Sequence, residues 1–379
     1  MIFLDIYLDN SATTRVCPEA ADMAYKVMTE VYGNPSSTHA RGREAKKLLD
    51  AARRELSLCL GCQPKELVFT SCGSEADNWA LLSGAFAASA KGGHVISSLT
   101  EHDAIRKSLD ELERRGYEVT RLAPDESGAI PVQSVVDALR PDTVLVSLML
   151  VNNETGAVND LPGVARALKK ANSKALLHCD AVQGFLKLPF TVKSLGADMV
   201  TISGHKIHAP KGIGALYIRS GLHLRPLIVG GSQEDGRRAG TEAMPNICAF
   251  GEAARIGRSL MAESTERMAQ LREHTVERLR AENPGLVVIG GGAPHILCIS
   301  LPGYRSEVLM NYLEARGISV SKSSACKKGG RSHVLEAMGL PAPVIDGALR
   351  LGLSRFTTKE ELDEFCRCLH EARETLSHT

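Results

Sequence analysis

The feature that most constrains the fold of this chain is a regular alternation of short apolar runs with stretches of helical period. Seven apolar runs lie between residues 60 and 220, at 67–69, 94–98, 117–120, 144–151, 175–178, 199–202 and 214–218. Most of the intervals between them have apolar residues at helical spacing, as in 104–115 and 161–171. Because strands joined by helices run parallel and are covered on both faces, the pattern predicts an α/β fold with a mostly parallel, seven-stranded sheet.

Helical patterns also flank this region. Residues 37–60 have an apolar stripe at helical spacing, and Gly61 follows it as a C-cap. A long helix-rich segment runs from near Gly251 to about Asn283, and we expect this segment to be the hinge into a second, smaller domain. In that domain the sequence predicts strands near 286–289 and 296–300, and helices near 306–316, 333–338 and 359–376.

The composition excludes several classes of protein. The 379 residues include 45 Lys and Arg and 44 Asp and Glu, so the net charge is +1 and a large basic surface for direct nucleic-acid binding is not expected. Ten cysteines in so long a chain do not make a disulfide scaffold. The first residues lack the features of a signal peptide, and no apolar run approaches the roughly 20 residues of a membrane span. We therefore expect a cytoplasmic protein with reduced cysteines and no membrane association.

A lysine follows one of the predicted strands in a segment dense in polar groups. Lys206 lies between His205 and a turn rich in Gly and Pro. A partly buried lysine amine can form a Schiff base with a carbonyl group, and Ser203 and His205 could donate to a phosphate. A solvated surface turn is the common alternative for an isolated lysine.

Other polar segments also follow predicted strands. Asp180 ends one predicted strand, and Gln183 follows three residues later. A carboxylate at this position suits the pyridine nitrogen of pyridoxal phosphate (PLP). Considered without the other segments, Asp180 would more commonly be a helix N-cap. Residues 70–78 combine small side chains with the start of a helix, which fits either a phosphate cradle or a capping turn. His102 could stack on an aromatic cofactor or be a structural histidine, and residues 151–156 place amides at a further strand end.

In order and spacing, these segments resemble those of the cysteine desulfurases, which are PLP enzymes of fold type I in the class V aminotransferase group. The resemblance covers nearly the whole chain and is carried by residues 7–14, 33–37, 70–78, 100–102, 151–156, 178–183, 203–212, 238–241, 323–326 and 350–358. It implies a large PLP-binding domain of residues 15–255. Residues 1–14 and 256–379 would form a small α+β domain that carries the catalytic cysteine.

The resemblance implies how the cofactor is bound. Lys206 would hold PLP as a Schiff base, His102 would stack on the ring and relay protons, and Asp180 would pair with the ring nitrogen. Gln183 would contact the ring oxygen, and Asn153 would also contact the cofactor. The phosphate would be bound by Gly73, Ser74, Ser203 and His205, and by Thr241, which would reach in from the partner subunit.

The same resemblance implies the reaction and its partners. Lys206 would act as the base at Cα of L-cysteine, and Cys326 would attack the substrate sulfur to form a persulfide while alanine leaves. The substrate would be bound by Asn153, Asn34 and Arg350, whose forked guanidinium suits a carboxylate. The sulfur would pass to an acceptor protein, either an iron–sulfur scaffold or a tRNA-thiolation enzyme, and the enzyme would be a homodimer with no metal.

Two kinds of alternative stay open. A selenocysteine lyase, a desulfinase or an ordinary aminotransferase would share the fold and the cofactor, and only transfer through a persulfide strictly requires Cys326. A protein of another class would be a non-enzymatic, cysteine-rich redox or metal-binding protein. Cys59 and Cys62 have C-x-x-C spacing, but a zinc site would need four ligands and no second pair accompanies them.

Some positions depart from the usual pattern of the family. Lys322 and Ser323 stand where the family usually has Ser or Thr followed by Gly, which should stiffen the backbone before Cys326. Cys72 stands where glycine is common, and we expect it to fill space beside the phosphate. The segment from Cys326 to His333 is short and the last predicted helix is followed by few residues, which favours a narrow set of acceptors. A dedicated tRNA-thiolation partner is therefore as compatible with the sequence as an iron–sulfur cluster scaffold.

Overall fold

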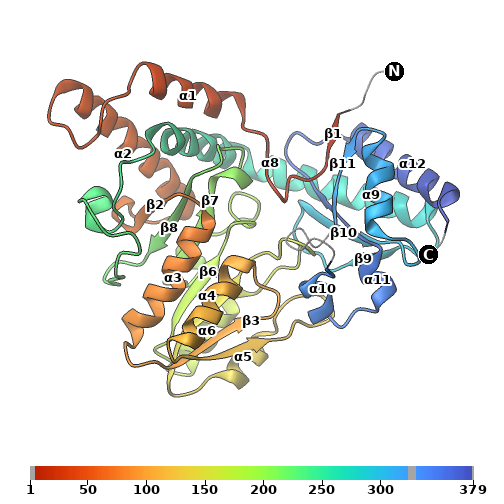
Figure 1. The fold of residues 1–379 in the computed structure, drawn as a ribbon, viewed down its shortest axis with the longest axis horizontal. Coiled ribbons are helices and arrows are strands. Elements are labelled where there is room, and N and C mark those ends of the chain that lie inside the picture. Colours follow the sequence, from red (N-terminus) through yellow and green to blue (C-terminus); the bar gives the residue numbers. More distant parts are fainter. Residues whose placement is uncertain (1–4, 323–329, 378–379) are drawn as a thin grey trace.

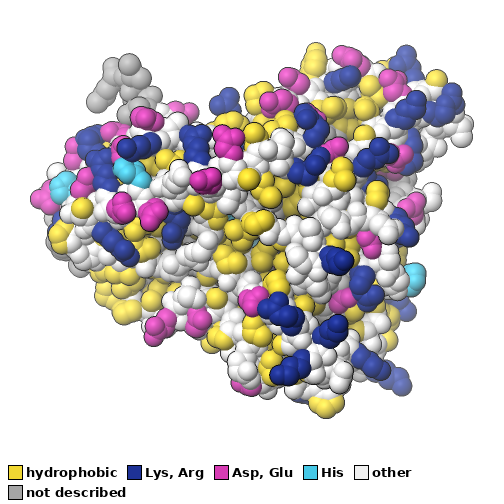
Figure 2. Space-filling model, turned by 180° about the vertical axis from the view of Figure 1, so that it is seen from behind, with side chains coloured by type: hydrophobic (Ala, Val, Ile, Leu, Met, Phe, Trp, Pro, Cys, Tyr) yellow, Lys and Arg dark blue, Asp and Glu magenta, His cyan; other side chains and the backbone are white. Residues whose placement is uncertain are grey.

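The computed structural model describes residues 5–322 and 330–377, so Ser323 and Cys326 lie outside the described residues. A larger part of the molecule is built around a seven-stranded sheet, and a smaller part around a four-stranded one (Figure 1). On the face shown in Figure 2, Lys and Arg side chains and Asp and Glu side chains occur over both parts, as the near-neutral composition predicts. Among the described residues, no helix is both long enough and apolar enough to cross a membrane.

The large sheet confirms the prediction from the apolar runs. Its strands are β2 (Leu67–Thr70), β3 (His94–Ser98), β4 (Glu118–Leu122), β5 (Thr143–Met149), β6 (Leu176–Asp180), β7 (Met199–Ser203) and β8 (Gly214–Ile218). They lie in the order β2-β8-β7-β6-β5-β3-β4. The pairs from β4 to β7 are parallel, whereas β8 pairs antiparallel with β7 and with β2. The sheet is therefore mostly parallel, as expected for strands connected by helices.

Helices cover both faces of this sheet. They are α1 (Pro18–Thr29), α2 (Ala40–Leu60), α3 (Gly73–Ala88), α4 (Asp103–Arg114), α5 (Val132–Ala138), α6 (Leu161–Lys170) and α7 (Val192–Leu195), with short 3-10 helices η1 (Pro64–Glu66), η2 (Gly204–Lys206) and η3 (Gln233–Gly236). Val95 of β3 packs with α3 and α4, whereas its neighbour Ile96 enters the core shared with α5, α6 and α7. Since side chains alternate along a strand, His178 and Asp180 of β6 share one face.

The predicted helix at 37–60 is present as α2. Ala45, Leu49 and Leu56 form its buried stripe, and Gly61 adopts a left-handed conformation with φ of 65° as the C-cap. The helix begins three residues later than predicted, at Ala40, because the His39 side chain accepts the backbone N–H of Gly42 and caps it.

The segment that the sequence predicted as a hinge is one continuous helix. Helix α8 runs over Met244–Glu282 and begins seven residues earlier than predicted. Its first turns place Phe250 in the core of the larger part, and its later turns place Met268 and Leu279 in the core of the smaller part. The predicted division near residue 255 falls inside α8, so the domain boundary stays a prediction.

The smaller part contains two small sheets. A parallel pair joins β1 (Ile6–Tyr7) to β11 (Ile318–Ser319), and an antiparallel sheet has the order β12-β13-β10-β9. The other elements are β9 (Val287–Ile289), β10 (Ile296–Ser300), β12 (Ser321–Lys322), β13 (Ala348–Gly352), α9 (Ser306–Glu314), α10 (His333–Ala337), α11 (Ala342–Asp346) and α12 (Lys359–Thr375). The α+β composition of this part was predicted, but β1, β11, β12, β13 and α11 were not.

Candidate active site

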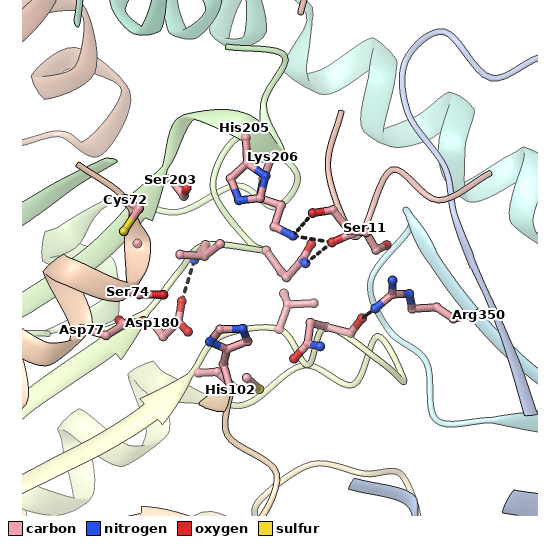
Figure 3. A pocket seen from close by; sticks show the side chains of 17 residues that line it. Ser11, Cys72, Ser74, Asp77, His102, Asp180, Ser203, His205, Lys206 and Arg350 are labelled. Atoms are coloured by element: carbon pink, nitrogen blue, oxygen red, sulfur yellow. Dashed lines mark hydrogen bonds between the residues drawn. The ribbon is translucent and has the colours of Figure 1, made fainter. Parts of the chain in front are cut away.

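A cavity of about 280 Å³ lies at the carboxyl ends of the central strands of the large sheet. Strands β5, β6 and β7 end at its wall with Met149, Asp180 and Ser203. The start of α3, the N-terminal segment and β13 of the smaller part complete the lining (Figure 3). The cavity thus lies at the strand edge where open α/β sheets bind ligands.

The cavity brings together most of the residues that the sequence singled out. Its lining includes Gly73, Ser74, His102, Asn153, Asp180, Gln183, Ser203, His205, Lys206 and Arg350, and also Cys72. Asn34 does not line it; this exposed residue lies between α1 and α2 and accepts the N–H of Ser36. Thr241 does not line it either and is exposed just before α8. Cys326 lies outside the described residues.

One end of the cavity suits an anion. The first turn of α3 begins there at Gly73, and the side chain of Cys72 does not cap it. A Cβ at Gly73 would lie 3.0 Å from Val182 Cγ2, so glycine leaves room for close approach to the backbone. The Oγ of Ser203 is buried and has no hydrogen-bond partner within the described residues. An orphaned hydroxyl beside a helix N-terminus fits a phosphate group, which supplies acceptor oxygens.

His205 borders the same end. Burial, followed by the charges of Lys206 and Lys211, lowers the pKa of His205 to about 4. Its ring is therefore neutral at physiological pH, and Nδ1 lies 3.2 Å from Thr13 Oγ1. A neutral imidazole can still donate one N–H to an anion.

Lys206 reaches into the middle of the cavity from η2. The preceding Gly204 allows the tight turn after β7, because a Cβ there would lie 2.7 Å from Ile213 Cγ2. The Lys206 amine donates to the carbonyl oxygens of Ser11 and, at 2.7 Å, of Ala12 (Figure 3). The N-terminal segment therefore holds the amine in the cavity, where a carbonyl compound could reach it.

Asp180, the last residue of β6, and His102, four residues after the end of β3, both face the cavity (Figure 3). Asp180 Oδ1 accepts the N–H of Val182 at 2.9 Å. Burial raises the pKa of Asp180, against the lowering by that hydrogen bond and by His102 and Lys206. His102 Nδ1 accepts the N–H of Ala104 at 3.2 Å and caps α4. A buried carboxyl without an ion pair among the described side chains fits a ring nitrogen that can be protonated.

Gln183 follows Asp180 in a series of turns and not in a regular helix. Its amide nitrogen donates to the carbonyl of Ser11 at 2.9 Å. Gln183 and Lys206 thus bind the same carbonyl from two sides, and together they fix the N-terminal segment over the cavity.

Arg350 enters the opposite end of the cavity from β13 and is only 2% exposed. Its Nη1 donates to the Asn153 carbonyl at 3.0 Å, and its Nη2 donates to Asp9 Oδ1 at 2.8 Å. Its Nε is buried and has no hydrogen-bond partner in the part of the chain that the structure describes. A guanidinium with an unsatisfied N–H at a cavity wall is suited to a carboxylate.

Sequence reasoning missed several residues of the lining. Asp77 lies one helical turn after Gly73 and Ser74, so i, i+3 and i, i+4 spacing could have placed it at the cavity. Ser11 and Ala12 contact Lys206 across more than 190 positions of the chain, and no local pattern announces such a contact.

Comparison with known proteins agrees with this geometry. A family model described as aminotransferase class V matches residues 6–365. Cysteine desulfurase 2 of Trichormus variabilis is 42% identical over 364 residues, covering 95% of this chain and 90% of that protein. Cysteine desulfurase IscS of Methanosarcina thermophila is 38% identical over 371 residues, covering 97% and 91%. A solved NifS-like protein superimposes with a TM-score of 0.93 at 35% identity, covering 98% of this chain and all of that one.

These matches define the class first: the fold and cavity are those of a PLP-dependent enzyme of fold type I. The chain belongs to the aminotransferase class V family and, within it, to the cysteine desulfurases. The family resemblance, the fold class, the cysteine desulfurase activity and the cofactor predicted from the sequence are thereby confirmed.

Proposed function

We propose that this protein converts L-cysteine to L-alanine and keeps the released sulfur as a persulfide on Cys326. The observation that carries the proposal is the meeting of Lys206 and Arg350 in one cavity, from elements more than 140 positions apart in the chain. An amine that can form a Schiff base and a guanidinium that can bind a carboxylate are the two groups that an α-amino acid substrate requires.

The described residues can hold PLP in one orientation. The N-terminus of α3, with Gly73 and Ser74, would bind the phosphate together with Ser203 and His205. Asp180 would pair with the ring nitrogen, and His102 would lie against the ring. When bound, PLP supplies an electron sink for negative charge at the substrate Cα.

The chain's own groups would then carry the reaction. Arg350 and Asn153 hold the substrate carboxylate, and Lys206 Nζ takes the proton from Cα. The Cys326 thiolate attacks the substrate sulfur, so an S–S bond forms as the Cβ–S bond breaks. The carbon skeleton takes up protons and leaves as alanine, so that L-cysteine and one thiol become alanine and one persulfide.

The sulfur would next pass to an acceptor protein, either an iron–sulfur scaffold or a tRNA-thiolation enzyme. The nine cysteines among the described residues are all free thiols, which supports work in a reducing compartment such as the cytoplasm. A selenocysteine lyase, a desulfinase or an aminotransferase would use the same cavity and is distinguished by its products.

The proposed activity is tested with the PLP-loaded protein and L-cysteine in the presence of a thiol reductant. We expect alanine and sulfide in equal amounts, because each turnover releases one of each. A protein that gains no visible absorbance with PLP, or that releases keto acid instead of alanine, contradicts the proposal. Selenocysteine and cysteine sulfinate, assayed in parallel, separate the alternatives.

We also propose that the enzyme is a homodimer. An exposed apolar segment precedes η3 and consists of Leu227, Ile228 and Val229, of which Val229 is 80% exposed. An ion pair of 2.6 Å between Glu234 of η3 and Arg53 of α2 holds η3 against α2. Exposed apolar residues on an anchored segment suit a protein interface. Thr241 follows this segment and does not line the cavity of its own subunit. This position supports its predicted role, which is to bind the phosphate in the cavity of the second subunit.

The dimer is tested by sedimentation equilibrium at assay concentrations. We expect a dimer for the wild type and a shift towards monomer for Val229→Asp, because a charge would be buried at the interface. Val308→Asp, at a residue 41% exposed on α9 in the smaller part, is the matched control and should stay dimeric. A monomeric wild type with full activity would refute the proposal.

A further inference from the structure

Three buried carboxyl groups lie in and beside the cavity, and the proposed reaction uses only one of them. Asp77 and Asp180 line the cavity itself, and Glu101 lies behind it next to His102. Their exposed fractions are 2%, 6% and 0%. No Lys or Arg in residues 5–322 and 330–377 forms an ion pair with any of the three. Buried charges without such partners are costly, so this group of acids needs an explanation.

Asp77 and Asp180 come from different elements and meet on the same wall. Asp77 is on the second turn of α3, which packs on β6, and Asp180 ends β6. Figure 3 labels both side chains on this wall of the cavity, and the charge of Asp180 acts on Asp77. Asp77 Oδ1 is buried and has no hydrogen-bond partner among the described residues.

The nearest basic group does not neutralise Asp77. His178 Nε2 lies 3.8 Å from Asp77 Oδ1, but this ring is fully buried and both its nitrogens contact hydroxyl groups. Ser147 Oγ lies 2.9 Å from Nδ1, and Thr201 Oγ1 lies 3.0 Å from Nε2. Burial lowers the pKa of His178 to about 3, so the ring is neutral in the working range of pH.

We propose that Asp77 and Asp180 share one proton, and that Asp77 keeps it when PLP is bound. The cavity then presents a single negative charge, on Asp180, to the single positive charge of a protonated ring nitrogen. Asp77 serves as a positioning residue, because its O–H can donate to Asp180 and hold that carboxylate in place. Two adjacent carboxyls in a buried site do not both ionise, and the titration belongs to the pair. This inference rests on the proposed use of PLP.

The surrounding groups favour that distribution of charge. Asp77 is faced by Asp180 and His178 from β6, Thr201 from β7, Glu101 from the segment after β3, and Cys72 at the start of its own helix. Burial, and then the charge of Asp180, raises the pKa of Asp77. Asp180 is also close to His102 and Lys206, which both lower its pKa. The proton of the pair therefore belongs on Asp77.

The test is infrared spectroscopy of PLP-loaded protein labelled with ¹³C-carboxyl aspartate, which separates aspartic acids from Glu101 and Glu154. We expect the C=O stretch of one protonated aspartic acid at neutral pH in the wild type and none in Asp77→Asn. Asp103→Asn, at a half-buried residue of α4 that pairs with Arg106 and does not line the cavity, is the matched control and should leave the band unchanged. Thermal unfolding verifies that each variant is folded.

A second readout is the dissociation constant of PLP, measured by fluorescence. Asp77→Asn retains a neutral N–H donor and should bind PLP within about threefold of the wild type. Asp77→Val retains the shape but no donor and should bind about tenfold more weakly. Absence of the band in the wild type, its persistence in Asp77→Asn, or equal weakening in both variants would each overturn the proposal. A wild type that binds no PLP would instead refute the proposed function.

Discussion

Replacing Lys206 with alanine is expected to lower the rate of alanine formation by a factor of about 10³ or more. The reason is that one amine has two tasks. It would bind the cofactor covalently, and it would move the proton at the substrate Cα. The Ser11 and Ala12 carbonyls hold Lys206 Nζ inside the cavity, and among the described residues Lys206 is the only lysine of the lining.

The measurement combines turnover with reduction by borohydride. Borohydride should fix PLP covalently to the wild type and not to Lys206→Ala, which can still bind PLP without a covalent bond. Lys211→Ala is the control, because Lys211 is five residues further along, donates to the Thr14 carbonyl at 3.2 Å and does not line the cavity. Covalent labelling of Lys206→Ala, or equal loss of activity in both variants, would disprove the assignment.

The large sheet and its local site residues were predictable because their signals are local. Each strand of a covered parallel sheet is apolar on both faces, so the runs stand out without knowledge of their neighbours. Lys206, Asp180 and His102 each come just after a strand or at its last residue, and parallel strands bring such ends to one edge. The sequence alone therefore predicts that these three side chains lie close together.

The rest of the site depends on contacts between distant segments. Arg350 reaches the cavity from β13, a strand that the sequence did not reveal, and its Asp9 partner lies 341 positions away. The carbonyls that hold Lys206 belong to residues 11 and 12, where no side-chain pattern marks a backbone contact. The long helical segment was predicted, but its first seven residues were missed, and the buried face of α8 changes from one core to another along its length.

Glu154 and Ser332 give another example of such a contact. The Ser332 hydroxyl donates to the buried Glu154 carboxylate, which follows Asn153 in the chain. Burial raises the pKa of Glu154 to about 7, against the lowering by that hydrogen bond and by Arg350. Nothing in the sequence pairs two residues 178 positions apart, yet the contact ties the start of α10 to the end of the cavity where Arg350 lies.

Replacing Cys326 with alanine is expected to reduce sulfide release from L-cysteine at least about a hundredfold while PLP binding and its absorbance are kept. The described cysteines explain why another thiol would not compensate. Burial raises the pKa of Cys62 to about 11 and of Cys248 to about 12, so both remain protonated and are poor nucleophiles at neutral pH. Among the described cysteines, only Cys72 lines the cavity.

The decisive comparison is therefore between Cys326→Ala, Cys72→Ala and the control Cys62→Ser, each scored for alanine, sulfide and protein-bound persulfide. We expect the persulfide, detected by mass spectrometry after a single turnover without reductant, in the last two variants and not in the first. Persulfide on Cys72 of the Cys326→Ala protein, with undiminished sulfide release, would move the sulfur-accepting role to the start of α3. Loss of sulfide release together with loss of PLP absorbance would instead mean that Cys326 supports the cofactor site. In the proposed reaction Lys206 moves the proton at Cα and Cys326 takes the sulfur. Lys206→Ala should therefore fail at proton removal, and Cys326→Ala at sulfur transfer.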